Sequence, residues 1–225
     1  MMIKRKKRGF LLWILLADLL VLIWTGLSSG EVRTAVVPFE AVYGQVGQEV
    51  VRCLSCGNLF GSGPIEGNPT GTLTQLVWDK LKEEEKGFDF INPDRVEGYY
   101  NVLLSKGFEK DPLRLMKTLG LEVKADYIFW GNLFRYQERI GSSYSVQKPA
   151  SVAFDLHLMR VKDGKLIWKA QWEYTQKPLS ENLLELGRFA KSHWRWVTAE
   201  ELFLQGLQDM LRNFPTADSL ILTKE

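Results

Sequence analysis

Hydrophobic residues are most concentrated at 125–134, in the run Ala-Asp-Tyr-Ile-Phe-Trp-Gly-Asn-Leu-Phe. The run is rich in aromatic and aliphatic residues and does not alternate regularly with polar positions. A strand covered on both faces shows this pattern, whereas a strand with one solvated face alternates. We therefore expect 125–134 to form the central strand of a mixed sheet.

A second strong pattern, at 151–174, predicts a long β-hairpin. Apolar residues occupy every second position of both halves: Val152, Phe154, Leu156 and Leu158 in the first, and Leu166, Trp168, Ala170 and Trp172 in the second. The two sets share a face if the connection has three residues, 162–164, with Gly164 left-handed in a bulge. This register places Leu158 beside Trp168. The other face carries Asp155, His157, Lys169, Gln171 and Glu173, and we expect it to be solvated.

Shorter patterns predict the remaining elements. Strands are expected at 34–39 and 88–92, and helices at 72–86, 93–107, 112–120 and 180–189, with a last helix that ends before Pro215. Asp94, Asp111 and Thr198 are the expected helix caps. The tail, 216–225, is expected to be an edge strand or a disordered end. The predicted fold class is α/β, with a single mixed sheet, helices packed on it, one long hairpin and an N-terminal hydrophobic helix.

The first thirty residues differ in composition from the rest. Five consecutive basic residues, 4–8, precede an apolar stretch, 10–27, that only Asp18 interrupts. This arrangement is typical of a segment addressed to a membrane. The stretch is longer than most signal-peptide cores and close to the roughly 17–25 residues that span a bilayer. A cleaved signal peptide, ending at the small residues 28–30, and an uncleaved N-terminal membrane anchor both stay open.

The same segment predicts the compartment. Basic residues stay on the cytoplasmic side of a membrane, so we expect the body of the protein in the bacterial periplasm. The first thirty residues carry a net +4, which leaves −2 for the rest because the whole chain carries +2. A weakly acidic body has no electrostatic footprint for nucleic acid. The expected organisation is the segment 1–30, one α/β domain at 31–215 and the tail.

The long irregular stretch 40–71 contains both cysteines of the chain, in the motif Cys-Leu-Ser-Cys-Gly. Outside the inner membrane a closely spaced cysteine pair is normally oxidised, so a disulfide between Cys53 and Cys56 is the leading expectation. A zinc site is an alternative, but it needs two more ligands, and only His157, His193 and carboxylates are available. Free thiols are a third alternative. Covalent haem attachment is excluded because no histidine follows the motif.

Two other groups of side chains could carry function. His157 shares a strand face with Asp155, which can orient an imidazole for acid–base catalysis, although a histidine on an exposed strand face is usually only solvated. Trp194, Arg195 and Trp196 form an aromatic and basic cluster of the kind enriched in protein interfaces. The alternative for this cluster is that its tryptophans clamp two helices onto the sheet.

The order of several segments resembles that of a group of bacterial envelope proteins that includes the curli-secretion lipoprotein CsgG, the penicillin-binding-protein activator LpoB and the N-terminal domain of TolB. The segments are AVVPF at 35–39, FDFINPDRV at 88–96, ADYIFWG at 125–131 and GKLIW at 164–168. The resemblance implies a compact sheet with packed helices, no enzymatic activity, and docking onto envelope partners or self-assembly. Lipid anchoring is not carried over, because no cysteine precedes Cys53.

We therefore predict a non-enzymatic cell-envelope protein that works through protein–protein contacts, as an accessory, assembly or activator protein of secretion or cell-wall machinery. No catalytic residue, cofactor or metal site is predicted, and buried apolar side chains are expected to explain the pattern after residue 30. The expected partners are envelope proteins, further copies of the chain, and the inner membrane if 10–27 is uncleaved. The alternative is a small extracytoplasmic thiol- or metal-dependent protein built on Cys53 and Cys56.

Overall fold

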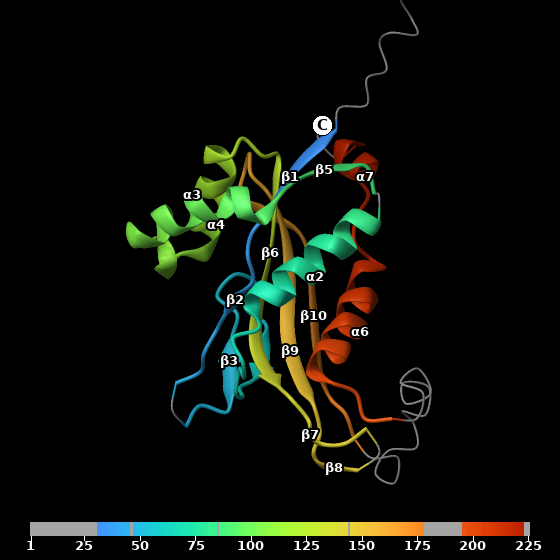
Figure 1. Ribbon diagram of the computed structural model, residues 1–225. Helices are drawn as coiled ribbons and strands as arrows, with labels where there is room; N and C mark the ends of the chain where they lie inside the picture. The colour runs from blue at the N-terminus through green and yellow to red at the C-terminus, as the bar shows by residue number, and fades with distance from the viewer. Residues whose placement is uncertain (1–30, 46, 85, 144, 178–194, 223–225) are drawn as a thin grey trace, which may run out of the picture. The chain divides into compact units, whose positions relative to one another are not determined.

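Strand β6 (Tyr127–Gln137) is the central strand of a six-stranded mixed sheet, as the sequence predicts (Figure 1). The computed structural model describes residues 31–45, 47–84, 86–143, 145–177 and 195–222. Eight consecutive residues of β6, from its first residue onward, are buried, which explains the absence of a polar alternation. The apolar stretch 10–27 and the predicted helix 180–189 lie outside the described residues.

The other strands of this sheet are β1 (Val32–Val36), β2 (Glu40–Ala41), β5 (Phe88–Ile91), β9 (Ser151–Arg160) and β10 (Lys165–Thr175). The strand order is β10-β9-β6-β1-β5, and β2 pairs with β6 beyond the end of β1. Strands β1, β2 and β5 run parallel to their neighbours, whereas β9 and β10 are antiparallel. Two small sheets are formed by β3 (Val50–Arg52) with β4 (Leu59–Gly61) and by β7 (Ile140–Gly141) with β8 (Val146–Lys148).

The described helices are α2 (Thr70–Glu83), α3 (Pro93–Ser105), the short 3₁₀ helix η1 (Phe108–Lys110), α4 (Pro112–Glu122), α6 (Ala199–Leu211) and α7 (Ala217–Leu222). Asp111 caps α4, and Thr198 forms a capping box with Glu201 at α6, as predicted. The cap of α3 is Asn92 rather than Asp94, because the Asn92 side chain accepts the hydrogen bond from the Asp94 backbone N–H. The tail forms α7 instead of an edge strand.

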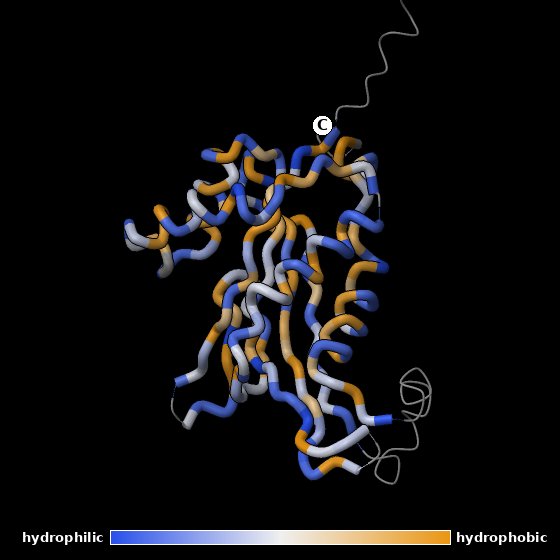
Figure 2. Tube along the Cα trace, in the orientation of Figure 1, coloured by the Kyte–Doolittle hydropathy of each residue, from blue (hydrophilic) through white to orange (hydrophobic). Residues whose placement is uncertain are grey.

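Helices α2 and α6 cover one face of the sheet, and α3 and α4 cover part of the other (Figure 1). In α6 the buried residues fall on one side of the helix, and Figure 2 shows its chain alternating between hydrophobic and hydrophilic stretches. Among the described residues, no helix combines the length and the hydropathy that crossing a membrane requires.

The β9–β10 hairpin has the predicted register, with Trp168 opposite Leu158 and Trp172 opposite Phe154. Gly164 is left-handed, with φ of +72°. The register is reached differently from the prediction. Arg160 pairs with Lys165, so the connection has four residues, and a bulge at Ile167 restores the alignment of the two apolar sets. The larger loop and the bulge offset each other because the loop takes one residue, Val161, from the β9 side and the bulge takes one residue, Ile167, from β10.

The expectation of a solvated second face on this hairpin is correct for β10 and wrong for β9. Lys169, Gln171 and Glu173 are exposed, but Asp155 and His157 are both 0% exposed. The reason is a piece of tertiary structure. The β3–β4 hairpin, from the predicted irregular stretch, lies over this part of β9 and shields it from water.

Two glycine-to-alanine substitutions test this packing. A methyl group at Gly131 in β6 would overlap the buried Phe39 ring, whereas one at Gly98 in α3 meets no atom within 4 Å. We expect Gly131→Ala to lower the free energy of unfolding by about 1–3 kcal/mol through overpacking. Gly98→Ala should raise it by about 0.5–1 kcal/mol through helix propensity. Urea unfolding of both variants measures this, and equal effects of the two changes would contradict the described packing.

Candidate functional site

The site is built on the turn that connects β3 to β4. The backbone N–H of Gly57 donates to the Cys53 carbonyl at 2.9 Å, and the Cys53 N–H donates to the Asn58 carbonyl at 2.8 Å. Gly57 has a φ of +79°, a conformation that glycine adopts without steric cost. This closed turn holds Cys53 and Cys56 close together at the tip of the hairpin.

Aromatic packing fixes the hairpin over the sheet. The ring of Phe60 in β4 stacks on Phe134 in β6, with centroids 4.1 Å apart and an interplanar angle of 7°. Arg135 donates to the Gly61 carbonyl at 2.9 Å and pairs with Glu173 of β10 at 2.8 Å. These contacts tie β4 to β6 and, through Arg135, to β10.

Four side chains from the turn and from β9 converge beneath the hairpin. One donor atom from each of Cys53, Cys56, Asp155 and His157 lies within 4.8 Å of all the others. His157 Nε2 is 3.7 Å from Cys53 Sγ and 3.5 Å from Asp155 Oδ2, and Cys56 Sγ is 3.8 Å from the same carboxylate oxygen. Cys53, Asp155 and His157 are buried, and Cys56 is half-buried.

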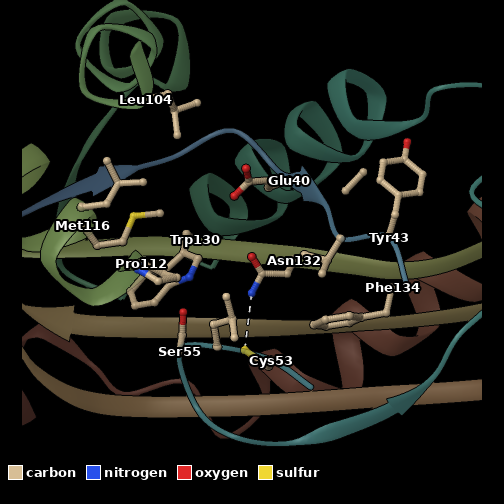
Figure 3. Close-up of a pocket in the computed structure, with 14 residues that line it drawn as sticks. Glu40, Tyr43, Cys53, Ser55, Leu104, Pro112, Met116, Trp130, Asn132 and Phe134 are labelled. Atoms are coloured by element: carbon tan, nitrogen blue, oxygen red, sulfur yellow. Dashed lines mark hydrogen bonds between the residues drawn. The ribbon is translucent and has the colours of Figure 1, made fainter. Parts of the chain in front are cut away.

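Asn132 of β6 holds the second oxygen of the Asp155 carboxylate. Its side-chain amide donates to Asp155 Oδ1 at 2.9 Å, and its backbone N–H donates to the same atom at 3.3 Å. Oδ2 is therefore left facing the thiol of Cys56 and the imidazole of His157. The side-chain amide also lies 3.7 Å from Cys53 Sγ (Figure 3). Asn132 thus orients the carboxylate toward the other three side chains.

The imidazole of His157 is held by stacking. Trp130 of β6 lies against it, with ring centroids 4.7 Å apart and an interplanar angle of 20°. The Nδ1 atom has no hydrogen-bond partner among the described residues, whereas Nε2 points at the sulfur and the carboxylate. Because only Nε2 has neighbouring polar groups in the described part of the chain, the group that Nε2 binds determines the tautomer of His157.

Burial sets the protonation of these groups in the absence of any ligand. It raises the pKa of Asp155 to about 7, against the opposing hydrogen bonds from Cys53 and Asn132. It lowers the pKa of His157 to about 3, and the positive charge of Lys169 acts in the same direction. The pKa of the Cys53 thiol is raised by burial and then by the neighbouring Asp155 carboxylate. The low dielectric disfavours the charged form of each of these three groups.

This arrangement corrects two expectations drawn from the sequence. Both cysteines are free thiols, so the disulfide between Cys53 and Cys56 is not supported. Buried apolar side chains also do not explain the whole pattern after residue 30, because Asp155 and His157 meet the two sulfurs in the interior. The sequence did contain one indication, since Asp155 and His157 alternate on one strand face. It could not show that the turn lies against them.

A pocket of about 340 Å³ lies beside the cluster (Figure 3). Its walls come from the cysteine turn, from β2, from α4 and from β6, and Cys53 and Asn132 both contribute to them. Hydrophobic side chains of α4 and the Trp130 ring form much of its lining. Cys53 is therefore the member of the cluster that borders this space.

The Trp194, Arg195 and Trp196 segment is only partly described. Trp194 and His193 lie outside the described residues. Arg195 pairs with Glu201, one of its guanidinium nitrogens donating at 3.0 Å, and its carbonyl accepts from Gln176. The Trp196 backbone N–H donates to the Ser143 carbonyl at 2.8 Å. These bonds tie the segment to the start of α6, to the residue after β10 and to the β7–β8 connection. Its role as an interface stays a prediction.

No family model matches the chain, and no curated protein matches it. Solved structures match the chain with TM-scores below 0.5. The PelC dodecamer of Paraburkholderia phytofirmans matches with a TM-score of 0.43 and 12% identity, over 80% of this chain and 86% of that chain. Lipoprotein GNA1162 from Neisseria meningitidis matches with a TM-score of 0.42 and 14% identity, over 72% and 92% respectively.

The C-terminal domain of LpoB from Escherichia coli matches with a TM-score of 0.38 and 12% identity, over 67% of this chain and 87% of that chain. LpoB is one of the proteins that the sequence resembles, whereas the resemblance to CsgG and TolB stays a prediction. Similarity of this degree concerns the arrangement of elements, and a shared arrangement does not specify a shared function.

In the reduced, metal-free protein, the shifted pKa values of Asp155 and His157 predict that the pair leaves the free energy of unfolding independent of pH over a defined window. Between the ordinary pKa values of 3.8 for aspartate and 6.5 for histidine, the unfolded pair holds one proton on histidine. The folded pair also holds one proton, on Asp155, because its pKa is raised and that of His157 is lowered. With equal proton counts in both states, the pair contributes no change of stability across this window.

Single substitutions separate the contributions of Asp155 and His157 to the pH dependence of stability. In Asp155→Asn the unfolded state binds more protons, so stability should rise with pH relative to the parent, by at most about 1.4 kcal/mol per pH unit. In His157→Gln the folded state binds more protons, so stability should fall as pH rises through the same window. Urea unfolding at several pH values in chelator and reductant measures both slopes. Parallel curves for the parent and both variants would contradict this assignment.

Proposed function

We propose that the protein is an accessory protein of the bacterial cell envelope that acts through contacts with other envelope proteins rather than by catalysis. The basic residues at 4–8 and the apolar stretch 10–27 support delivery across the inner membrane, with the body anchored there or released into the periplasm. The same exported body can also bind further copies of itself. The choice between a hetero-partner and self-association is part of the proposal's test.

The observation that carries the proposal is the outer surface of the cysteine hairpin. Three large hydrophobic side chains of the hairpin are exposed, Leu54 at 69%, Leu59 at 55% and Val50 at 44%, and Tyr43, between β2 and β3, is 71% exposed. Tyr43 and Leu54 border the same pocket. Isolated apolar residues on a surface are ordinary, but several on one loop indicate a protein contact region. A loop that a rigid sheet holds in place is also a common location for binding residues.

The inner side of the hairpin supports binding rather than catalysis. Cys53 is 2% exposed, and Asp155 and His157 are 0% exposed. A general acid or base has to reach the atom it protonates or deprotonates, directly or through one water. With three of its four members buried, the cluster presents little reactive surface to a substrate. Its arrangement suits a role in holding the hairpin.

The second candidate is a thiol- or metal-dependent enzyme, and one observation favours it. The pocket of about 340 Å³ borders Cys53, so a small molecule in it would lie next to a sulfur of the cluster. Reaction of Cys53 with a small, neutral thiol reagent that enters the pocket of the folded protein would favour this candidate. Protection of Cys53 until the protein unfolds would favour the binding role.

Site-specific photocrosslinking in intact cells tests the proposed contact region. A photoreactive residue in place of Leu59 should crosslink to a defined envelope protein or to a second copy of the chain. The same residue in place of Gln208, an exposed position on α6, is the matched control. Leu54→Asp should reduce the crosslink from position 59 by about tenfold or more, as expected when a charge replaces an apolar anchor. Equal crosslinking from both positions, or from neither, would refute the contact region.

Export is tested separately with a reporter. Alkaline phosphatase fused after Glu225 should be active in cells, because the enzyme needs disulfides that form outside the cytoplasm. Removal of residues 1–30 should abolish this activity while leaving the fusion protein expressed. Mass spectrometry of the purified parent then identifies its mature N-terminus and distinguishes cleavage from anchoring. Retained phosphatase activity after the removal would contradict an export role for the segment.

A further inference from the structure

We propose that Cys53, Cys56, Asp155 and His157 bind one zinc ion, which fastens the cysteine hairpin to β9. This inference is independent of the proposed envelope partner. It rests on the type of the donor atoms, their separations, and the way neighbouring groups orient them. Each of these is a property of described residues in the folded chain.

The donor set is the first support. Two thiolates, one imidazole nitrogen and one carboxylate oxygen are all ligands that zinc takes in proteins. Calcium and magnesium prefer oxygen ligands, and a mixed sulfur and nitrogen set with tetrahedral geometry is typical of zinc. Four protein ligands with no open position are characteristic of a structural zinc site rather than a catalytic one. The burial of Cys53, Asp155 and His157 agrees with a closed site.

The separations of the donor atoms are the second support. Zinc bonds are about 2.0–2.3 Å long, so the donor atoms of a tetrahedral site lie about 3.3–3.8 Å apart. Three separations in this cluster fall in that range, and all four donor atoms lie within 4.8 Å of one another. The three separations are 3.5 Å between nitrogen and oxygen, 3.7 Å between nitrogen and sulfur, and 3.8 Å between sulfur and oxygen. A small adjustment of side-chain torsions is enough to bring all four atoms to bonding distance.

Neighbouring groups orient the donors, which is the third support. Asn132 holds Asp155 Oδ1 with two N–H groups and leaves Oδ2 for the metal. Trp130 stacks on His157 and keeps Nε2 directed at the sulfur of Cys53. Such outer contacts are characteristic of metal sites, where they fix the orientation of the ligands.

Charge and proton balance are consistent with binding. Zinc would replace the protons of both thiols and of Asp155, and these protons would pass to solvent. Two thiolates and one carboxylate around Zn²⁺ leave one negative charge. Lys169 of β10 pairs with His157 in the ladder and is the nearby positive charge that opposes it. The metal would therefore give the three buried polar side chains, Cys53, Asp155 and His157, a common partner.

The test uses the full chain, extracted from membranes without chelator. We expect one zinc per chain by elemental analysis, released when an organomercurial reagent blocks the thiols. Cobalt in place of zinc should give the visible absorption bands of tetrahedral Co²⁺ and a thiolate charge-transfer band. Cys53→Ser and Cys56→Ser should lose the zinc and the charge-transfer band. Leu54→Ala, in the same turn but without a donor atom, is the matched control and should retain both.

A substitution at Asn132 distinguishes its role in orienting Asp155 from a role in maintaining the fold. Asn132→Ala should keep the cobalt spectrum and weaken zinc binding by about 10–100-fold in competition with a chelator, as expected for an outer contact. Circular dichroism verifies that each variant is folded. Removal of zinc from the parent should also change the fluorescence of Trp130, because its stacking partner His157 is released.

Three results would overturn the proposal. Thiols that alkylate only after reduction, in zinc-free protein, would show a disulfide. Thiols that alkylate without reduction in protein that binds no added zinc would show free cysteines. Zinc retained at full stoichiometry in folded Cys53→Ser and Cys56→Ser would place the metal elsewhere. Failure of the crosslinking test would leave the zinc measurements unaffected, so the two proposals fail separately.

Discussion

The packing of the cysteine hairpin on the β6–β9 pair determines the chemistry of this protein. Helices α3 and α4 cover one part of the second face of the sheet, and the remaining part is covered by the hairpin through the stack of Phe60 on Phe134. Without that cover, the polar residues of β9 would face water. With it, they lie at the boundary between two apolar clusters, where each must find a partner or remain uncharged.

Polar groups at such a boundary are unfavourable unless they satisfy one another. Asn132 and Asp155 do so directly through two hydrogen bonds, and Asp155 extends this network to His157 and the sulfurs. A network of this kind is stable when complete and destabilising when one member is removed. The four donor atoms thus have a structural reason to stay together, and a bound zinc ion would complete the network by offsetting two of the three negative charges of its ligands.

The two sides of the hairpin have different roles in these proposals. The outer side presents Val50, Leu54 and Leu59 to solvent, and the inner side holds the two cysteines against the sheet. A zinc ion bound by Cys53 and by residues of β9 would restrain a loop that is otherwise held by short strands. The exposed side chains of the loop would then be kept in one arrangement. Preorganised loops bind partners with a smaller entropic cost than flexible ones. The internal cluster and the external contact region are therefore physically connected, although each has its own test.

Local patterns in the sequence determined most of the fold. The central strand, the apolar register of the β9–β10 hairpin, and the helix starts at Asp111 and Thr198 follow from hydrophobic periodicity and capping, because neighbours in sequence decide these features. Tertiary structure alone decided the candidate site. Cys53 and His157 are 104 positions apart, and no local pattern shows that a glycine-rich loop folds over one strand. The polar alternation of β9 predicted a solvated face, and long-range packing reversed that prediction because burial depends on which segments cover a surface.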